Sequence, residues 1–169
     1  MNKSNFIIIQ GSSKSHGNTR QVVEYILSQK EGKFIDLNTK EITYFDYEHK
    51  NVEDDFLKVI TEVLEHEIII FATPVYWYTM SATLKTFIDR ISDLLKIRKD
   101  LGRQLRGKRM MVVACSSDQT EYPSFWEPFK LTAKYLGMEY LGHAHTWISS
   151  GSIPIPVKQS IDKLIEKLD

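Results

Sequence analysis

The sequence predicts an α/β protein with a doubly wound, five-stranded parallel sheet in the order 2-1-3-4-5 and helices on both faces. Three observations support this prediction. Five short apolar segments alternate along the chain with five segments in which apolar residues follow helical spacing. The strand candidates are apolar throughout, which is typical of strands covered by helices on both faces. A loop of small polar residues follows the first strand, and five strands with such a loop favour this order over the six-stranded dinucleotide-binding order.

The expected strands are 6–9, 33–37, 68–72, 110–115 and 140–148. The first and third are continuous runs rich in β-branched residues, as expected of buried strands. Helices are expected where apolar residues recur every three and four positions, in segments 19–30, 56–64, 84–95, 125–136 and 161–168. No linker or internal repeat divides the chain, so residues 1–169 are expected to form one domain.

The composition excludes several classes of protein. Hydrophobic residues make up 42% of the chain and charged residues 26%, which excludes wholesale disorder. Lys plus Arg and Asp plus Glu both number 22, so the net charge supports neither a nucleic-acid partner nor a strongly acidic electron carrier. The single cysteine, Cys115, excludes intramolecular disulfides and multi-cysteine metal sites. No apolar run suits a membrane span or a signal peptide, so we expect a cytoplasmic protein without a membrane partner.

The loop after the first strand, residues 11–19, has the composition of a phosphate-binding loop. It contains two glycines, three serines, a threonine, an asparagine and a lysine. Small residues let backbone N–H groups approach phosphate oxygens, and the positive end of the following helix favours the anion. Neither the P-loop pattern nor the dinucleotide fingerprint is present, so the loop suits a terminal phosphate better than a pyrophosphate. The alternative is a simple turn in which Asn18 or Thr19 caps the helix.

Two further loops follow the third and fourth strands. The segment 73–81 carries three consecutive aromatic residues, Tyr76, Trp77 and Tyr78, which suit the wall of a site for a flat ring system. An exposed patch used for dimerisation is the alternative, and the two are compatible. The segment 116–122 is polar and rich in hydrogen-bond donors. In a 2-1-3-4-5 sheet it lies beside the 73–79 loop at the same edge.

Three motifs, in order along the chain, resemble those of the flavodoxin-like NAD(P)H-dependent FMN reductases. They are Gly-Ser-Ser followed by Gly-Asn-Thr within 11–19, Thr-Pro-Val-Tyr-Trp at 73–77, and Leu-Lys-Thr-Phe-Ile-Asp-Arg at 84–90. The resemblance covers nearly the whole chain, and the Pro-x-Tyr-Trp turn with the Lys-x-Phe-Ile-Asp-Arg helix is its most specific part. It implies a flavodoxin-like fold. Relatives with an iron–sulfur cluster on extra cysteines are excluded, because this chain has one cysteine.

The resemblance also implies which residues bind FMN. The 5′-phosphate would be held by the first loop, at Ser12, Lys14, Asn18 and Thr19. The isoalloxazine would lie along the second loop, with backbone N–H groups aimed at its polar edge, at Pro74, Val75, Tyr76 and Trp77. The pyrimidine or ribityl side would be approached by the third loop, at Ser116 and Ser117. His16 has a supporting part at most.

The implied function is that of an FMN-dependent NAD(P)H oxidoreductase. NADPH or NADH passes a hydride to the flavin, which reduces a small acceptor such as a quinone, a nitro or azo compound, a free flavin or a ferric chelate, with ping-pong kinetics. The cofactor performs this chemistry, so no residue is assigned as a catalytic acid or base. The family also implies a homodimer or homotetramer. Two alternatives stay open: a flavodoxin-type electron carrier, and a flavodoxin-fold binding module without catalysis.

The remaining reactive residues have simpler expected roles. Cys115 ends an apolar strand and is expected to be a buried packing residue rather than a nucleophile. His143 and His145 point to one face of the last strand, but no further ligands accompany them and we expect no metal site. Asp89 and Arg90 are expected to form ion pairs or caps on their helix rather than take part in catalysis.

Overall fold

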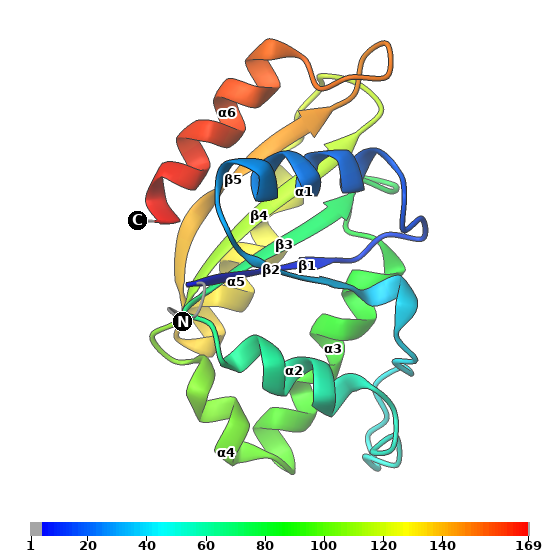
Figure 1. Ribbon diagram of the computed structural model, residues 1–169. Coiled ribbons are helices and arrows are strands. Elements are labelled where there is room, and N and C mark those ends of the chain that lie inside the picture. The colour runs from blue at the N-terminus through cyan, green and yellow to red at the C-terminus, as the bar shows by residue number, and fades with distance from the viewer. Residues whose placement is uncertain (1–4, 169) are drawn as a thin grey trace.

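The five strands form one parallel sheet in the order β2-β1-β3-β4-β5, which confirms the predicted topology. A computed structural model describes residues 5–168 (Figure 1). Its strands are β1 (Phe6–Gln10), β2 (Lys33–Asp36), β3 (Ile68–Pro74), β4 (Arg109–Ser116) and β5 (Glu139–Trp147). Each lies within two residues of the expected bounds at both ends.

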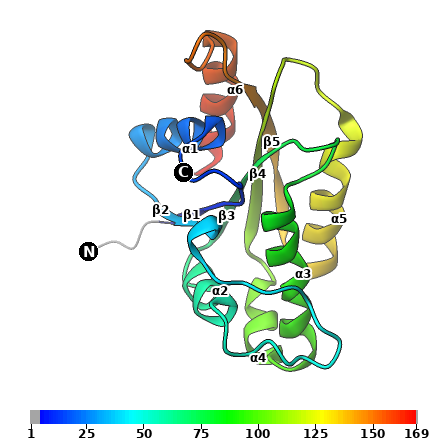
Figure 2. The same cartoon turned by 90° about the vertical axis from the view of Figure 1, so that its right-hand side faces the viewer.

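Helices cover both faces of the sheet. They are α1 (Asn18–Gln29), α2 (Phe56–Leu64), α3 (Ala82–Lys96), α4 (Lys99–Gly102), α5 (Glu127–Leu136) and α6 (Ile155–Ile165). Figure 2 shows α1 and α6 on one face and α2, α3 and α5 on the other. The short helix α4 is an addition, since the sequence there shows only a basic stretch. Helix α6 begins earlier than expected, because Val157 extends its buried face toward the N-terminus.

The central strands are buried on both sides, which explains their continuous apolar sequences. In β1, Ile7 and Ile9 pack with α2, α3 and α5, whereas Ile8 packs with α1 and α6. All three side chains have no exposed surface. Full burial of each contributes roughly 2–3 kcal/mol before entropic costs. A polar substitution at any of these positions therefore disrupts one of the two helix layers.

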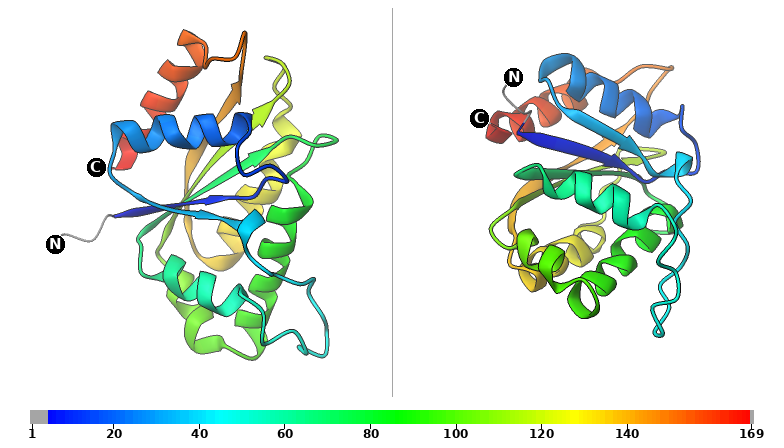
Figure 3. Two further views of the ribbon diagram at one scale, coloured as in Figure 1. Left: turned by 45° about the vertical axis from the view of Figure 1, so that its right-hand side comes forward. Right: turned by 60° about the horizontal axis from the view of Figure 1, so that its bottom comes forward.

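The strand register brings three loops to one edge of the sheet. Gln10 at the end of β1 pairs with Ala72, and Pro74 at the end of β3 pairs with Cys115. The loops after β1, β3 and β4 therefore begin next to one another, and Figure 3 shows the first two projecting from the same edge. Within residues 5–168, no helix has both the length and the apolar composition needed to cross a membrane.

A buried arginine fixes the polar connection between β2 and α2, which passes across α3 in Figure 2. Arg90 on α3 is 1% exposed and pairs with Asp54 of the connection and, at 2.7 Å, with Asp93. Burial opposes ionisation of Asp54, but hydrogen bonds from Arg90 and Thr43 lower its pKa. The expected ion-pairing role of Arg90 is confirmed. Removing one partner of such a buried pair typically costs about 3–5 kcal/mol.

Candidate functional site

The loops after β1, β3 and β4 enclose a cavity of about 630 Å³. Nine of the ten predicted site residues line it: Ser12, Lys14, Asn18, Thr19, Pro74, Val75, Tyr76, Ser116 and Ser117. Trp77, the tenth, does not line the cavity, and its side chain is 91% exposed. Residues outside the prediction also contribute, namely His16, Gly17, Gln21 and Cys115. The cavity lies where β1 and β3 adjoin, at the switch point of the sheet, where ligands bind in open α/β folds.

One end of the cavity is the N-terminus of α1. Gly17 is the N-cap, no side chain of residues 5–168 caps the helix, and its first turn contains no acidic residue. The alternative prediction of a cap by Asn18 or Thr19 is therefore wrong, because both residues already lie inside the helix. The first N–H groups of a helix have no partner within it and carry partial positive charge. This end of the cavity is therefore suited to an anion.

Hydrogen bonds from the end of β1 and within the loop fix the segment that leads to α1. Gln10 is fully buried, and its side-chain Nε2 donates to the carbonyl of Ser15 at 3.2 Å. The backbone N–H of Lys14 donates to the Ser12 hydroxyl at 3.2 Å. Ser12 and Thr19 are both 4% exposed, whereas the Lys14 side chain reaches solvent. Small hydroxyl side chains thus line the base of the loop and a cation lies at its rim.

A tight hairpin forms the second wall. The backbones of Tyr76 and Thr79 exchange hydrogen bonds of 2.9 and 3.1 Å, and the two residues between them have positive φ, 48° at Trp77 and 64° at Tyr78. Such left-handed conformations are unfavourable for bulky residues and cluster at functional sites. The turn therefore holds two aromatic side chains where Asn and Gly are the usual residues.

The hairpin corrects one expectation about the ring-binding wall. The N–H of Val75 donates to the carbonyl of Cys115 at 2.9 Å, and that of Tyr76 donates to Thr79. Pro74 has no N–H. The backbone N–H groups of Val75 and Tyr76 therefore do not face a cofactor, because β-type pairing already uses them, whereas the expected role of the Trp77 N–H stays a prediction. What this wall offers is the apolar surface of Val75 and the ring of Tyr76.

Aromatic contacts link the three loops. The hydroxyls of Ser13 and Tyr76 lie 3.0 Å apart, joining the first loop to the hairpin. The rings of Tyr78 and Tyr122 meet edge to face with centroids 4.8 Å apart, joining the hairpin to the third loop. Trp77, Tyr78 and Tyr122 are all at least 41% exposed. An exposed aromatic surface therefore lies beside the cavity.

The third loop is anchored to β5. The Ser116 hydroxyl lies 2.7 Å from Nε2 of His145 and donates to the carbonyl of Asp118 at 2.5 Å. His143 stacks on Trp126 with ring centroids 4.0 Å apart, and the Trp126 Nε1–H donates to Glu121 at 2.8 Å. Burial lowers the pKa of both histidines. The sequence placed the two histidines on one face of β5 but did not predict this link to Ser116.

Cys115 lies in the cavity wall but is 6% exposed. Burial raises the pKa of its thiol, so the unreactive protonated form predominates at neutral pH. This confirms the expectation of a buried packing residue. Asp89 pairs with Lys85 at 2.6 Å on the surface of α3, which also agrees with its expected role.

The chemistry of the lining fits a flavin mononucleotide. An uncapped helix end, a lysine and buried hydroxyls lie at one end of the cavity, as a phosphate requires. An apolar and aromatic wall with few polar groups forms the other side, as a flat ring requires.

Comparison with known proteins agrees with this interpretation. The family described as NADPH-dependent FMN reductase matches residues 4–151. The chain belongs to this family. YwqN of Bacillus subtilis strain 168, provisionally named an NAD(P)H-dependent FMN-containing oxidoreductase, is 32% identical over 146 residues, covering 80% of this chain and 81% of that protein.

Two solved structures support the fold. The Trp repressor binding protein of Bacillus subtilis has a TM-score of 0.71 and 27% identity, with 94% of this chain and 92% of that chain covered. A flavodoxin of Megasphaera elsdenii has a TM-score of 0.59 and 13% identity, with 96% and 98% covered, which confirms the flavodoxin-like fold. The predicted resemblance, the enzyme class and the FMN cofactor with NAD(P)H as reductant are thus confirmed.

Proposed function

We propose that the cavity binds FMN with its phosphate at the N-terminus of α1 and its ring against the β3 hairpin. Ser12, Asn18 and Thr19 hold the phosphate oxygens, and Lys14 supplies charge at the rim. Pro74, Val75 and Tyr76 lie along the ring, and Ser116 and Ser117 approach its pyrimidine or ribityl side. The observation that carries the proposal is that anion-binding and ring-binding walls line one cavity.

When bound, FMN would supply the hydride-transfer chemistry that links NADPH or NADH to a second substrate. The protein contributes binding and orientation, because near-attack alignment of two rings supplies much of the rate. Hydride transfer itself needs no acid–base pair from the residues that line the cavity. Reductant and acceptor use the same space in turn, so the proposal includes ping-pong kinetics. It also includes the cytoplasmic location predicted from the sequence.

We further propose that the acceptor is a small, flat aromatic compound, such as a quinone, a nitro or azo compound or a free flavin. Trp77, Tyr78 and Tyr122 present exposed rings beside the cavity. Aromatic side chains stack on flat ligands with offset or edge-on geometry worth about 0.5–1.5 kcal/mol per pair. A ferric chelate, the other predicted acceptor, gains less from such a surface and is expected to be the poorer substrate.

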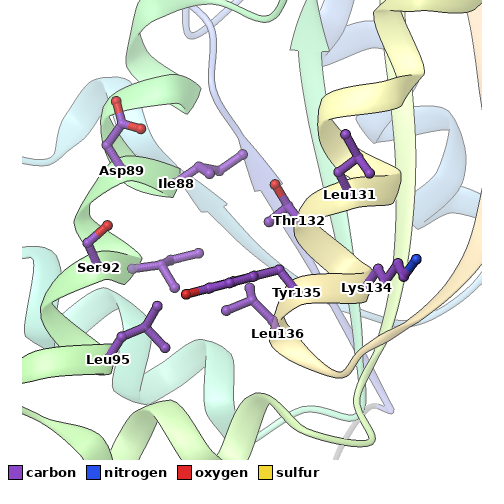
Figure 4. Close-up of a pocket in the computed structure, with 10 residues that line it drawn as sticks. Ile88, Asp89, Ser92, Leu95, Leu131, Thr132, Lys134, Tyr135 and Leu136 are labelled. Atoms are coloured by element: carbon purple, nitrogen blue, oxygen red, sulfur yellow. The ribbon is translucent and has the colours of Figure 1, made fainter.

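The protein is proposed to act as a homodimer that pairs through an apolar groove between α3 and α5. The groove has a volume of about 800 Å³, and Figure 4 shows Tyr135 extending from α5 across it toward α3. Leu131 and Tyr135 are 61% and 79% exposed, which is costly unless a partner covers them. Asp89 lies on the α3 rim and Lys134 on α5 forms no ion pair within residues 5–168. In the proposed dimer, a two-fold axis would place Asp89 of one copy, which also pairs with Lys85, near Lys134 of the other.

The visible absorption spectrum tests the cofactor site. Protein incubated with FMN and freed of excess ligand should retain about one flavin per chain. Anaerobic addition of NADPH or NADH should then bleach the spectrum, which an electron carrier without nicotinamide specificity does not do. A colourless protein would overturn the assignment of the cavity.

Sedimentation tests the dimer. Tyr135→Glu should shift the protein from dimer to monomer, because it places a charge in the apolar groove. Tyr44→Glu is the matched control, since Tyr44 is 78% exposed but lies outside the groove. A wild-type monomer, or a dimer unaffected by Tyr135→Glu, would contradict this interface.

A further inference from the structure

The Ser116 hydroxyl has its single hydrogen already committed. It donates to the carbonyl of Asp118 at 2.5 Å, and a carbonyl oxygen can only accept. Nε2 of His145 lies 2.7 Å from the same hydroxyl, so this nitrogen must be the donor. The contact therefore defines the tautomer of neutral His145, with its proton on Nε2. Toward the cavity, Ser116 retains only an acceptor lone pair.

The other ring nitrogen of His145 is available to a proton. Nδ1 forms no hydrogen bond within residues 5–168, and the ring contacts Trp147 at a centroid distance of 5.7 Å. Asp118 and Glu121 of the third loop face the imidazole and favour its protonation, whereas burial opposes it. His143, two residues earlier on β5, is a further titratable group on the same strand. Burial is the larger of these opposing effects, so the pKa of His145 lies below its ordinary value, and the neutral form of the ring is favoured.

We propose that His145 is a positioning residue of the FMN pocket, which fixes the Ser116 hydroxyl as an acceptor and takes up a proton when the bound cofactor is reduced. The proposal rests on FMN occupying this cavity. Ser116 lines the cavity directly, and His145 acts on it through one hydrogen bond. The acceptor at Ser116 suits a ring N–H, which is the one donor on the polar edge of an oxidised flavin.

The charge balance of reduction explains the proton uptake. A hydride from NAD(P)H carries two electrons and one proton to the cofactor, which therefore gains one negative charge. One solvent proton binding at Nδ1 of His145 neutralises that charge, while Nε2 keeps donating to Ser116. A negative charge nearby stabilises the imidazolium, so the pKa of His145 must be higher with the reduced cofactor than with the oxidised one. Proton uptake occurs at pH values between these two pKa values.

Three variants separate positioning from proton uptake. His145→Gln keeps an N–H donor for Ser116 but cannot titrate, and His145→Phe removes both properties. His143→Gln is the matched control, because it changes a histidine on the same strand and face that contacts Trp126 and Glu121 rather than Ser116. The measurements are FMN affinity, the reduction potential of the bound flavin against pH, and the imidazole ¹⁵N shifts of the apoprotein.

The expected results differ for each variant. FMN binds about tenfold more weakly to His145→Phe and within about twofold of wild type to His145→Gln, as one hydrogen bond implies. The potential of the wild type and of His143→Gln falls more steeply with pH than that of His145→Gln. The additional decrease in potential is about 30 mV per pH unit. This is the value for a two-electron couple when the uptake of one extra proton changes the equilibrium constant tenfold per pH unit. In the apoprotein, neutral His145 carries its proton on Nε2.

Three other outcomes would each contradict a different part of the proposal. Wild-type protein that binds no FMN would overturn the proposed function itself. Wild-type protein that binds and reduces FMN, with the same pH slope in His145→Gln, would overturn the proton uptake alone. A neutral Nδ1–H tautomer in the apoprotein would overturn the positioning of Ser116, whatever the cofactor does.

Discussion

Two helices begin at the same edge of the sheet, after the neighbouring strands β1 and β3, and their N-termini differ in kind. At α3, the Ser81 hydroxyl accepts from the N–H of Leu84 at 3.1 Å and donates to the carbonyl of Gly11 at 2.6 Å. Ser81 is 2% exposed, and its own N–H donates to the Thr73 hydroxyl. The start of α3 is thus closed. At α1, Gly17 offers no side chain, and the helix end opens into the cavity.

The start of α3 supports the fold, whereas the start of α1 is left for a ligand. The closed end packs tightly, since a Cβ at Gly11 would lie 2.4 Å from the Cβ of Leu84. Glycine is required there because the start of α3 approaches the first loop so closely. At the open end, no side chain of residues 5–168 caps the helix, so its first N–H groups remain available to a bound anion.

Closing the open end should have the largest effect on binding. In Gly17→Asp, the carboxylate caps α1 and repels the phosphate, so FMN affinity should fall by about 100-fold while stability rises by about 1 kcal/mol. Gly17 has φ of −128° and ψ of −164°, which aspartate adopts readily at an N-cap. Fluorescence titration and urea denaturation measure the two quantities.

Two controls make this test specific. Gly17→Ala adds a Cβ that meets Lys14 at 3.4 Å but no charge, so it should retain most FMN affinity. Riboflavin lacks the phosphate, so its affinity should be equal in Gly17→Asp and the wild type. Equal losses for FMN and riboflavin would place the phosphate somewhere other than α1.

Opening the closed end should reduce stability instead. Ser81→Ala leaves the N–H of Leu84 and the carbonyl of Gly11 without their buried partner, at a cost of about 2 kcal/mol. FMN affinity, measured below the unfolding transition, should stay within about threefold of wild type. A stable variant with strongly weakened FMN binding would mean that α3 belongs to the binding site rather than to its support.

The sheet order could be predicted from local patterns, and the nine lining residues from the resemblance of three motifs to the FMN reductase family. Continuous apolar runs such as 68–72 identify buried strands, and small polar residues after β1 identify an anion-binding loop. Parallel topology then brings the loops together without further information. The strand order therefore predicted where the three loops meet, the loop composition indicated an anion site, and the resemblance indicated which residues line it.

The features that sequence analysis missed depend on contacts between distant residues. Nothing near Ser116 indicates that it meets His145, 29 residues later. A tight turn at Pro74 predicts free backbone donors at Val75 and Tyr76, but the partners that use these donors, Cys115 and Thr79, cannot be recognised from the sequence. A signal for the buried Arg90 was present, since position 90 lies three residues after Phe87 on the apolar stripe of α3. A charge in such a stripe indicates buried partners.

The hairpin between β3 and α3 allows a third test, because it contains two residues with positive φ and leads directly into the closed end of α3. Trp77→Asn places a residue tolerant of positive φ where Trp77 has φ of 48°, and stability should rise by about 1 kcal/mol. The KM for an aromatic acceptor should rise by about tenfold as stacking surface is lost. Tyr44→Asn, an exposed aromatic outside the hairpin, should change neither quantity. Unchanged acceptor kinetics in Trp77→Asn would remove Trp77 from the substrate site.

The smallest effect is expected from the cation at the rim of the open end. The Lys14 side chain is exposed, and within residues 5–168 only its backbone N–H hydrogen-bonds the loop, so its charge is screened by solvent. Lys14→Ala should weaken FMN binding by about threefold at low salt, and the difference should disappear near 1 M salt. Titrations at several salt concentrations measure this. Suppose instead that Lys14→Ala loses about 100-fold in FMN affinity and that the loss persists at high salt. The lysine, rather than the α1 backbone, would then be the main phosphate ligand. The contrast between the two helix ends would in that case have no functional meaning.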